Sequence, residues 1–140
     1  MTTVVDSNVI VALWDRDDNV STTAQKALDS ALDRGSLVVP APVFAELMAL
    51  PGRSESFLDT FFQDTDVEVD WTLDEDVWWA AGRAFQSYAG RRLKQRAPGP
   101  RRILADFLIG AYAASKGSPL LTLDEGIYRA GFPELKILRV

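Results

Sequence analysis

The chain contains no cysteine and no histidine in 140 residues, and each absence removes a class of chemistry. Without cysteine there is no disulfide framework, no zinc site built on thiolates and no thiol nucleophile. Without histidine, Ser-His-Asp hydrolysis and metal ligation by imidazole are excluded. Any catalysis must therefore rest on carboxylates, hydroxyl groups, Lys or Arg side chains, or a bound ion.

Long hydrophobic runs are also lacking, since none approaches the ~20 residues of a membrane-spanning helix. The N-terminus has neither a basic segment nor a plausible cleavage site of a secretory signal. We therefore expect a cytoplasmic protein without a membrane partner. With 47% hydrophobic and 25% charged residues, the composition is typical of a globular chain. The length fits a single domain, residues 1–140.

The hydrophobic pattern alternates between strands and helices. Short apolar strands are predicted at "TVV", "SLVVP", "VEVDW", "PLLTL" and "KILRV". Helices are predicted at residues 8–14, in "VSTTAQKALDSALDRG" and "VFAELMAL", around Phe57 to Phe62, at residues 73–93 and in "ILADFLIGAYAAS". Strands separated by helices predict an α/β fold, a three-layer α/β/α sandwich with a central parallel sheet. Functional residues of such sheets gather at the carboxyl ends of the strands.

Four carboxylates stand isolated in apolar segments. Asp6 ends the first strand, and Asp124 closes the run "SPLLTL". Glu46 is the only charge in "PAPVFAELMALPG", and Asp106 is the only charge in "ILADFLIGAYAAS". Any one of them alone is explained by a helix N-cap, a salt bridge in the core or a surface position. Asp124 in particular is explained by a cap of the turn "DEGIYR".

The four acids together favour a different interpretation. None has a Lys or Arg in its own segment, and an unpaired buried carboxylate is costly. A divalent cation removes this cost, and oxygen ligands suit Mg²⁺ or Mn²⁺. We therefore predict one metal site that contains all four.

The helix that carries Asp106 has a helical pattern of its own. Its core-facing positions are predicted to be Leu104, Phe107, Leu108 and Ala111. This leaves Asp106, Gly110 and Ala113 on a different face, where small residues would let a bulky ligand approach.

The segments "VVDSNVIVAL", "PAPVFAEL", "ILADFLIGAYA" and "LLTLDEGIYR" resemble the four motifs of the PIN domain family. Their order and the chain length are similar to those of the VapC-like toxins of bacterial toxin–antitoxin pairs. The resemblance implies an α/β/α sandwich and a homodimeric endoribonuclease that uses Mg²⁺ or Mn²⁺, cleaves RNA and is inhibited by a cognate antitoxin. It assigns the metal ligands and catalytic residues to Asp6, Glu46, Asp106 and Asp124.

Three further positions match the motifs. Ser7 and Asn8 fall in the family's Asp-Ser/Thr-Asn signature, and Thr122 supplies the hydroxyl of its Thr-x-Asp motif. The alternative for Ser7 and Thr122 is that they only hold the loops in place.

Three other functions stay open. One is a phosphohydrolase on a Rossmann-like sheet, which usually needs a second acid where this chain has Asn8. The others are an RNA-processing PIN nuclease outside toxin–antitoxin pairs, and a non-catalytic PIN module that binds RNA or protein.

The charge is unevenly distributed around a net value of −5. Residues 55–76 hold nine acids and no Lys or Arg, whereas residues 83–102 hold seven Lys or Arg and no acid. We expect the basic segment to guide RNA by contacts to phosphates from Arg91, Arg92, Arg101 and Arg102. The alternative is a solvated helix end that complements its dipole. The acidic segment keeps the protein soluble or meets a basic partner.

Three tryptophans lie close together in the sequence: Trp71, Trp78 and Trp79. Trp78 is expected alongside the core-facing positions of its helix, and Trp79 points away from them. We expect Trp79 to be covered by the rest of the domain, with a role as an interface anchor as the alternative.

Overall fold

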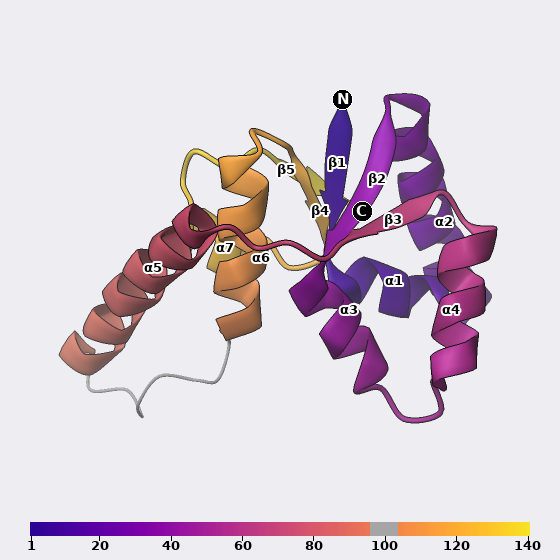
Figure 1. Cartoon of the computed structure of the whole chain (residues 1–140), viewed down its shortest axis with the longest axis horizontal. Coiled ribbons are helices and arrows are strands. Elements are labelled where there is room, and N and C mark those ends of the chain that lie inside the picture. The colour runs from indigo at the N-terminus through magenta and orange to yellow at the C-terminus, as the bar shows by residue number, and fades with distance from the viewer. Residues whose placement is uncertain (96–103) are drawn as a thin grey trace.

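A parallel five-stranded sheet forms the centre of the protein, in a computed structural model that describes residues 1–95 and 104–140 (Figure 1). The strands lie in the order β3-β2-β1-β4-β5, and every neighbouring pair is parallel. Their bounds are β1 Thr2–Val5, β2 Ser36–Pro40, β3 Val67–Asp70, β4 Leu120–Thr122 and β5 Ile137–Arg139. The predicted parallel sheet is confirmed.

Helices cover both sides of the sheet, as the predicted three-layer sandwich requires. Helices α1 to α4 lie together on one side in Figure 1, and α5 to α7 lie on the other. Their bounds are α1 Ser7–Leu13, α2 Asp18–Asp33, α3 Ala41–Met48, α4 Glu55–Asp64, α5 Glu75–Lys94, α6 Leu104–Ser115 and α7 Gly126–Gly131. Short α7 was not predicted, because its sequence "GIYRAG" begins and ends with glycine and is too short to show a helical period.

The central strands explain why the sheet is buried on both faces. Val4 and Val5 of β1 point to opposite faces, and both have no exposed surface. Because all strands run in one direction, β1, β2 and β4 end at the same edge of the sheet. Helices α1 and α3 begin immediately after β1 and β2. This edge therefore receives the side chains that follow each strand.

Within residues 1–95 and 104–140, no helix is long and apolar enough to cross a lipid bilayer.

Two expectations about aromatic burial are wrong. Trp79 is 61% exposed and Trp78 is 50% exposed, although the first was expected to be covered and the second to lie beside the core. Both stand on α5, whose buried positions are Val77 and Ala81. The two tryptophans lie on the outer face of this helix, where the described part of the chain leaves them largely exposed.

The predicted faces of α6 also need correction. Leu104, expected in the core, is 44% exposed because it begins the helix. Gly110 and Ala113 do not leave space for a ligand, since both are buried. A Cβ atom on Gly110 would lie 2.4 Å from the ring of Phe132, so this glycine admits an aromatic side chain of the protein itself. Almost the whole circumference of α6 is therefore core.

The contact between Gly110 and Phe132 gives a prediction. Gly110→Ala gains up to about 1 kcal/mol of helix propensity but crowds the ring, so we expect a net loss of stability of about 1 kcal/mol. In a Phe132→Ala background the same substitution should stabilise the protein. Denaturant unfolding of the four variants measures the coupling free energy. Equal effects of Gly110→Ala in both backgrounds would mean that the ring does not fill this position.

Candidate functional site

Asp6 is a buried carboxylate whose hydrogen-bond donors, among the described residues, carry no formal charge. It follows β1 and is the N-cap of α1, where its Oδ1 accepts from the Ser7 backbone N–H at 2.7 Å. Its Oδ2 accepts from the Thr122 hydroxyl at 2.9 Å and the Tyr128 hydroxyl at 2.8 Å. Only 3% of Asp6 is exposed. The N-cap explanation therefore holds for Asp6, but it accounts for only one of these bonds.

Thr122 joins the two segments that carry Asp6 and Asp124. Its hydroxyl donates to Asp6 and accepts from the Asn8 side-chain amide at 3.2 Å and from the Asp124 N–H at 3.1 Å. Asn8 also accepts from the Leu123 N–H at 3.2 Å. The single proton and both lone pairs of the Thr122 hydroxyl are thus all used. Asn8 and Thr122 fix the loop after β4 against the start of α1.

Glu46 reaches the same edge of the sheet from the second turn of α3. The Ser7 hydroxyl lies 3.1 Å from Glu46 Oε1 and 3.4 Å from Asp6 Oδ1, and it has a single proton to donate. The Ser7 side chain therefore links the first two acids of the predicted set, and the Ser7 backbone N–H donates to the N-cap Asp6.

Asp106 approaches Asp6 from the first turn of α6. A residue that sequence reasoning missed lies between them: the Tyr128 hydroxyl is 2.8 Å from Asp6 Oδ2 and 3.4 Å from Asp106 Oδ1. Tyr128 is 1% exposed. The only indication in the sequence was that Tyr128 follows Asp124 by four residues. A buried tyrosine hydroxyl normally requires a polar partner, and a nearby acid could be that partner.

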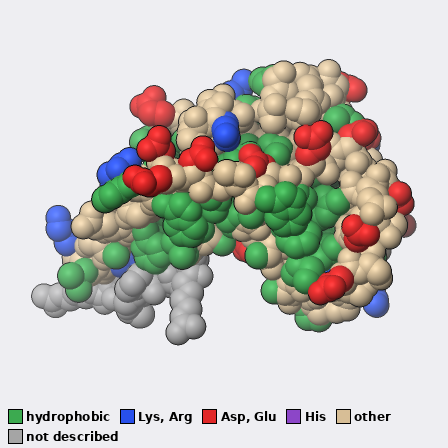
Figure 2. Space-filling model, in the orientation of Figure 1, with side chains coloured by type: hydrophobic (Ala, Val, Ile, Leu, Met, Phe, Trp, Pro, Cys, Tyr) green, Lys and Arg blue, Asp and Glu red, His purple; other side chains and the backbone are tan. Residues whose placement is uncertain are grey.

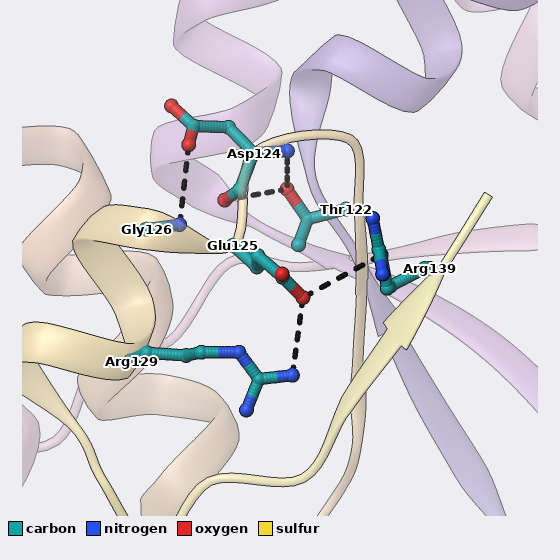
Figure 3. Close-up of polar contacts among 6 residues, drawn as sticks. All are labelled: Thr122, Asp124, Glu125, Gly126, Arg129 and Arg139. Atoms are coloured by element: carbon teal, nitrogen blue, oxygen red, sulfur yellow. Dashed lines mark hydrogen bonds and ion pairs between the residues drawn. The ribbon is translucent and has the colours of Figure 1, made fainter.

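Asp124 is exposed and has a looser position than the other three acids. Its Oδ1 accepts from the Gly126 N–H at 3.3 Å, so the predicted alternative of a local turn cap also applies. Figure 3 shows its carboxylate pointing away from that of the next residue, Glu125. Glu125 forms ion pairs with both nearby arginines, Arg129 at 3.0 Å and Arg139 at 3.6 Å. Among the described residues, Asp124 therefore has no ion pair.

Burial and mutual repulsion make these carboxylates harder to ionise. Burial raises the pKa of Asp6, although hydrogen bonds from Tyr128, Thr122 and Ser7 oppose the change. Burial and the charges of Asp6 and Asp106 raise the pKa of Glu46. Burial and the charges of Asp6 and Asp124 raise the pKa of Asp106 to about 6. The charge of Asp6 thus acts on Glu46 and Asp106, and the charge of Asp124 acts on Asp106.

The donor set fits a divalent cation. In the part of the chain that the structure describes, salt bridges involve Glu125 and not Asp6, Glu46, Asp106 or Asp124. Hard oxygen donors that repel one another and lack a cationic partner suit Mg²⁺ or Mn²⁺. Across residues 1–95 and 104–140, however, no three acids are already arranged to hold an ion. Asp6 explains this in part, since its Oδ2 already accepts two hydrogen bonds and its Oδ1 accepts from the Ser7 backbone N–H.

A surface cavity brings part of the basic segment to the acids. It has a volume of about 390 Å³, and its lining includes Asp106, Asp124, Arg91 and Arg92. The two arginines come from the last turn of α5, where they also complement the helix dipole. Arg92 additionally lies over the Tyr88 ring. The other two predicted RNA contacts, Arg101 and Arg102, lie outside the described residues.

The raised pKa of Asp106 gives a prediction for the protein in chelator. Its value of about 6 in the folded state exceeds the ordinary 3.8, so protonation favours folding. Stability should rise as pH falls from 7 toward 4. Because Asp106 is about half buried, we expect the free energy of unfolding to increase by about 1 kcal/mol, which corresponds to roughly 3 °C in Tm.

The comparison variant is Asp106→Asn, which should be more stable than the wild type at pH 7 and equally stable near pH 4. Thermal unfolding from pH 4 to pH 7.5 measures both proteins. If the stabilities of the two proteins changed with pH in the same way, this would contradict a raised pKa of Asp106.

Known proteins with the same fold include components of bacterial complexes. VapBC2 from Rickettsia felis, bound to a DNA fragment from their promoter, superposes with a TM-score of 0.68 at 16% identity, covering 100% of this chain and 99% of that one. VapBC-1 from nontypeable Haemophilus influenzae gives 0.67 at 17% identity, with 99% and 98% covered. A toxin–antitoxin complex from Klebsiella pneumoniae gives 0.62 at 16% identity, with 97% and 95% covered.

No curated protein sequence matches the chain. The model of the PIN domain family matches residues 3–133, which is most of the sequence. Together with the parallel sheet and the acids at its carboxyl edge, this match shows that the chain belongs to the PIN domain family.

Proposed function

We propose that the protein is a metal-dependent endoribonuclease, the toxin of a toxin–antitoxin pair, that hydrolyses RNA phosphodiester bonds in the cytoplasm. The observation that carries the proposal is the group of four acids, which form no salt bridge among the described residues, beside a cavity lined by two arginines. An acid cluster of this kind favours a cation, and arginines favour a phosphate. A phosphodiester is a substrate that satisfies both.

Asp6 and Asp106 are the proposed principal ligands of Mg²⁺ or Mn²⁺. When bound, such an ion would polarise a phosphoryl oxygen and lower the pKa of a water molecule. Glu46 and Asp124 would hold the ion directly or through water, or orient the attacking water. Ser7, Asn8 and Thr122 would keep the two loops in register, as their hydrogen bonds indicate. The absence of histidine is compatible with this chemistry, because the base is then a carboxylate or solvent.

Arg91 and Arg92 are the proposed contacts to the RNA backbone. They line the cavity that contains Asp106 and Asp124, so a phosphate held there would lie next to the acids. Such contacts position a strand without selecting its sequence. Arg101 and Arg102 are proposed to extend this basic route.

An antitoxin and a second copy of the chain are the proposed protein partners. The antitoxin is supported by the fold shared with proteins from VapBC and toxin–antitoxin complexes. A homodimer is supported by the exposed Trp78 and Trp79, which line an apolar cavity of about 440 Å³ on α5. Figure 2 shows hydrophobic side chains gathered over this helix. Large exposed aromatic side chains are typical anchors of interfaces.

Hydrolysis of RNA by purified protein tests the proposal. With Mn²⁺ present we expect cleavage, and Asp106→Asn should lower its rate by about 100-fold or more, because a lost ligand removes several kcal/mol of transition-state stabilisation. The matched control is Asp59→Asn, an exposed acid of α4. Expression of the wild type should arrest bacterial growth, and Asp106→Asn should relieve the arrest at equal protein level. Full cleavage in chelator, or by Asp106→Asn, would favour a different site or a non-catalytic module.

The RNA route is tested by the salt dependence of binding. Removing two phosphate contacts with Arg91→Gln/Arg92→Gln should flatten the log–log slope by roughly 1.4 for a single strand. The control is Arg16→Gln/Lys26→Gln, which removes two exposed cations near and within α2. Affinity for RNA is measured against salt concentration in each variant. If both double substitutions changed the slope equally, Arg91 and Arg92 would not be specific contacts, and the RNA would bind elsewhere.

A further inference from the structure

Strand β3 is an edge strand whose outer side has no neighbouring strand among the described residues. Its pairing with β2 sets Leu37 opposite Val67 and Val39 opposite Val69. The Ser36 N–H donates to Met1 O, so the backbone of Ser36 faces β1. Because backbone groups alternate along a strand, Leu37 and Val39 face β3.

This register determines which N–H and C=O groups of β3 point toward β2 and which point to the free edge. In a parallel pair, a residue that faces its partner strand bonds to the two neighbours of the residue opposite. Leu37 and Val39 therefore bond to Asp66, Glu68 and Asp70. Val67 and Val69 turn their N–H and C=O groups to the free edge. The Val67 N–H bonds at 3.4 Å to the Thr65 hydroxyl, in agreement with this direction.

Open space lies on both faces of the sheet beside this edge. On one side is a cavity of about 780 Å³ that runs along Val67, Glu68 and Val69 toward α4 and the 64%-exposed Trp71. On the other side is a cavity of about 350 Å³ whose lining includes Glu68, Asp70 and Tyr112. Side chains of an added strand would alternate between these two spaces.

The charge around the edge is negative. Asp59, Asp66 and Glu68 are exposed and line the larger cavity. The Tyr112 hydroxyl donates to Asp70 at 2.6 Å and holds the pKa of that carboxyl below its usual value, so Asp70 keeps its charge at neutral pH. Lys116 is the one cation lining either cavity in the described part of the chain. Figure 2 shows acidic side chains prevailing on this side of the molecule.

We propose that β3 binds an extended, basic segment of a partner protein, which adds a strand to the sheet and places its cationic side chains among Asp59, Asp66 and Glu68. Main-chain hydrogen bonds to Val69 and Val67 give the segment its direction, and the acids select its charge. The proposal is independent of the nuclease function, because this edge is formed by β3 and not by the four acids of the candidate site.

Charge complementarity selects this occupant over two others. A second copy that paired β3 with β3 would bring Glu68 and Asp66 close to their own counterparts, and like charges across strands are destabilising. RNA would meet the same acids with its phosphates. Acids on an edge strand also prevent unwanted pairing in many proteins, and this protective role alone is the explanation that the experiment must separate from binding.

The probe is a capped eight-residue peptide of alternating arginine and valine, measured by calorimetry with the full chain. Two control peptides have the same length: one has glutamate in place of arginine, and the other keeps arginine but has every backbone amide N-methylated. We expect the first peptide to bind at least about tenfold more tightly than either control. Asp66→Asn/Glu68→Gln should weaken its binding at least about tenfold, and Asp29→Asn/Glu134→Gln, which neutralises two exposed acids away from β3, should not.

Hydrogen exchange gives a second readout at the proposed bond. The Val69 N–H should exchange at least about tenfold more slowly in the complex with the first peptide. Equal binding of the N-methylated peptide would mean attraction by charge alone and would overturn the added strand. Absence of binding by the first peptide, or unchanged exchange at Val69 in its complex, would leave the acids with the protective role only.

Discussion

The charge on Asp6 is the constraint that organises one end of this protein. A carboxylate at the end of the central strand is almost completely buried, and the groups that hold it are hydroxyls and a backbone N–H. These donors compensate part of the cost of burial but none of the charge. Every other acid that approaches meets an uncompensated negative field, as the raised pKa values of Glu46 and Asp106 reflect. A cation is what would balance this end of the sheet.

Two arginines of α5, Arg91 and Arg92, line the same cavity as Asp106 and Asp124. Next to Asp124, Glu125 forms ion pairs with Arg129 and Arg139 on the side away from the Asp124 carboxylate. The negative edge at β3 is built differently: its acids are exposed, and they surround backbone groups rather than one another. One edge thus suits an ion and a phosphate, and the other suits a basic chain.

Most of the fold could be predicted from sequence, because alternating strands and helices leave few topologies for a chain of this length. The four acids could be singled out as candidates, since each interrupts an apolar segment that gives a strong pattern. Tyr128 could not, because its role depends on α7, which is too short to show periodicity, and on a hydroxyl contact between segments far apart in sequence. Trp79 and Gly110 were misjudged for a related reason: helical spacing tells which side a residue faces, but not whether another element covers that side.

Anomalous diffraction from crystals grown with Mn²⁺ is the sharpest test of metal binding by these acids, because it locates the ion without reference to activity. We expect a peak between Asp6 and Asp106, with carboxylate oxygens of both at roughly 2.1 Å and the Tyr128 hydroxyl displaced from at least one of them. A peak at other acids, or no peak while Tyr128 keeps both contacts at saturating Mn²⁺, would mean that Asp6 and Asp106 do not form a metal site.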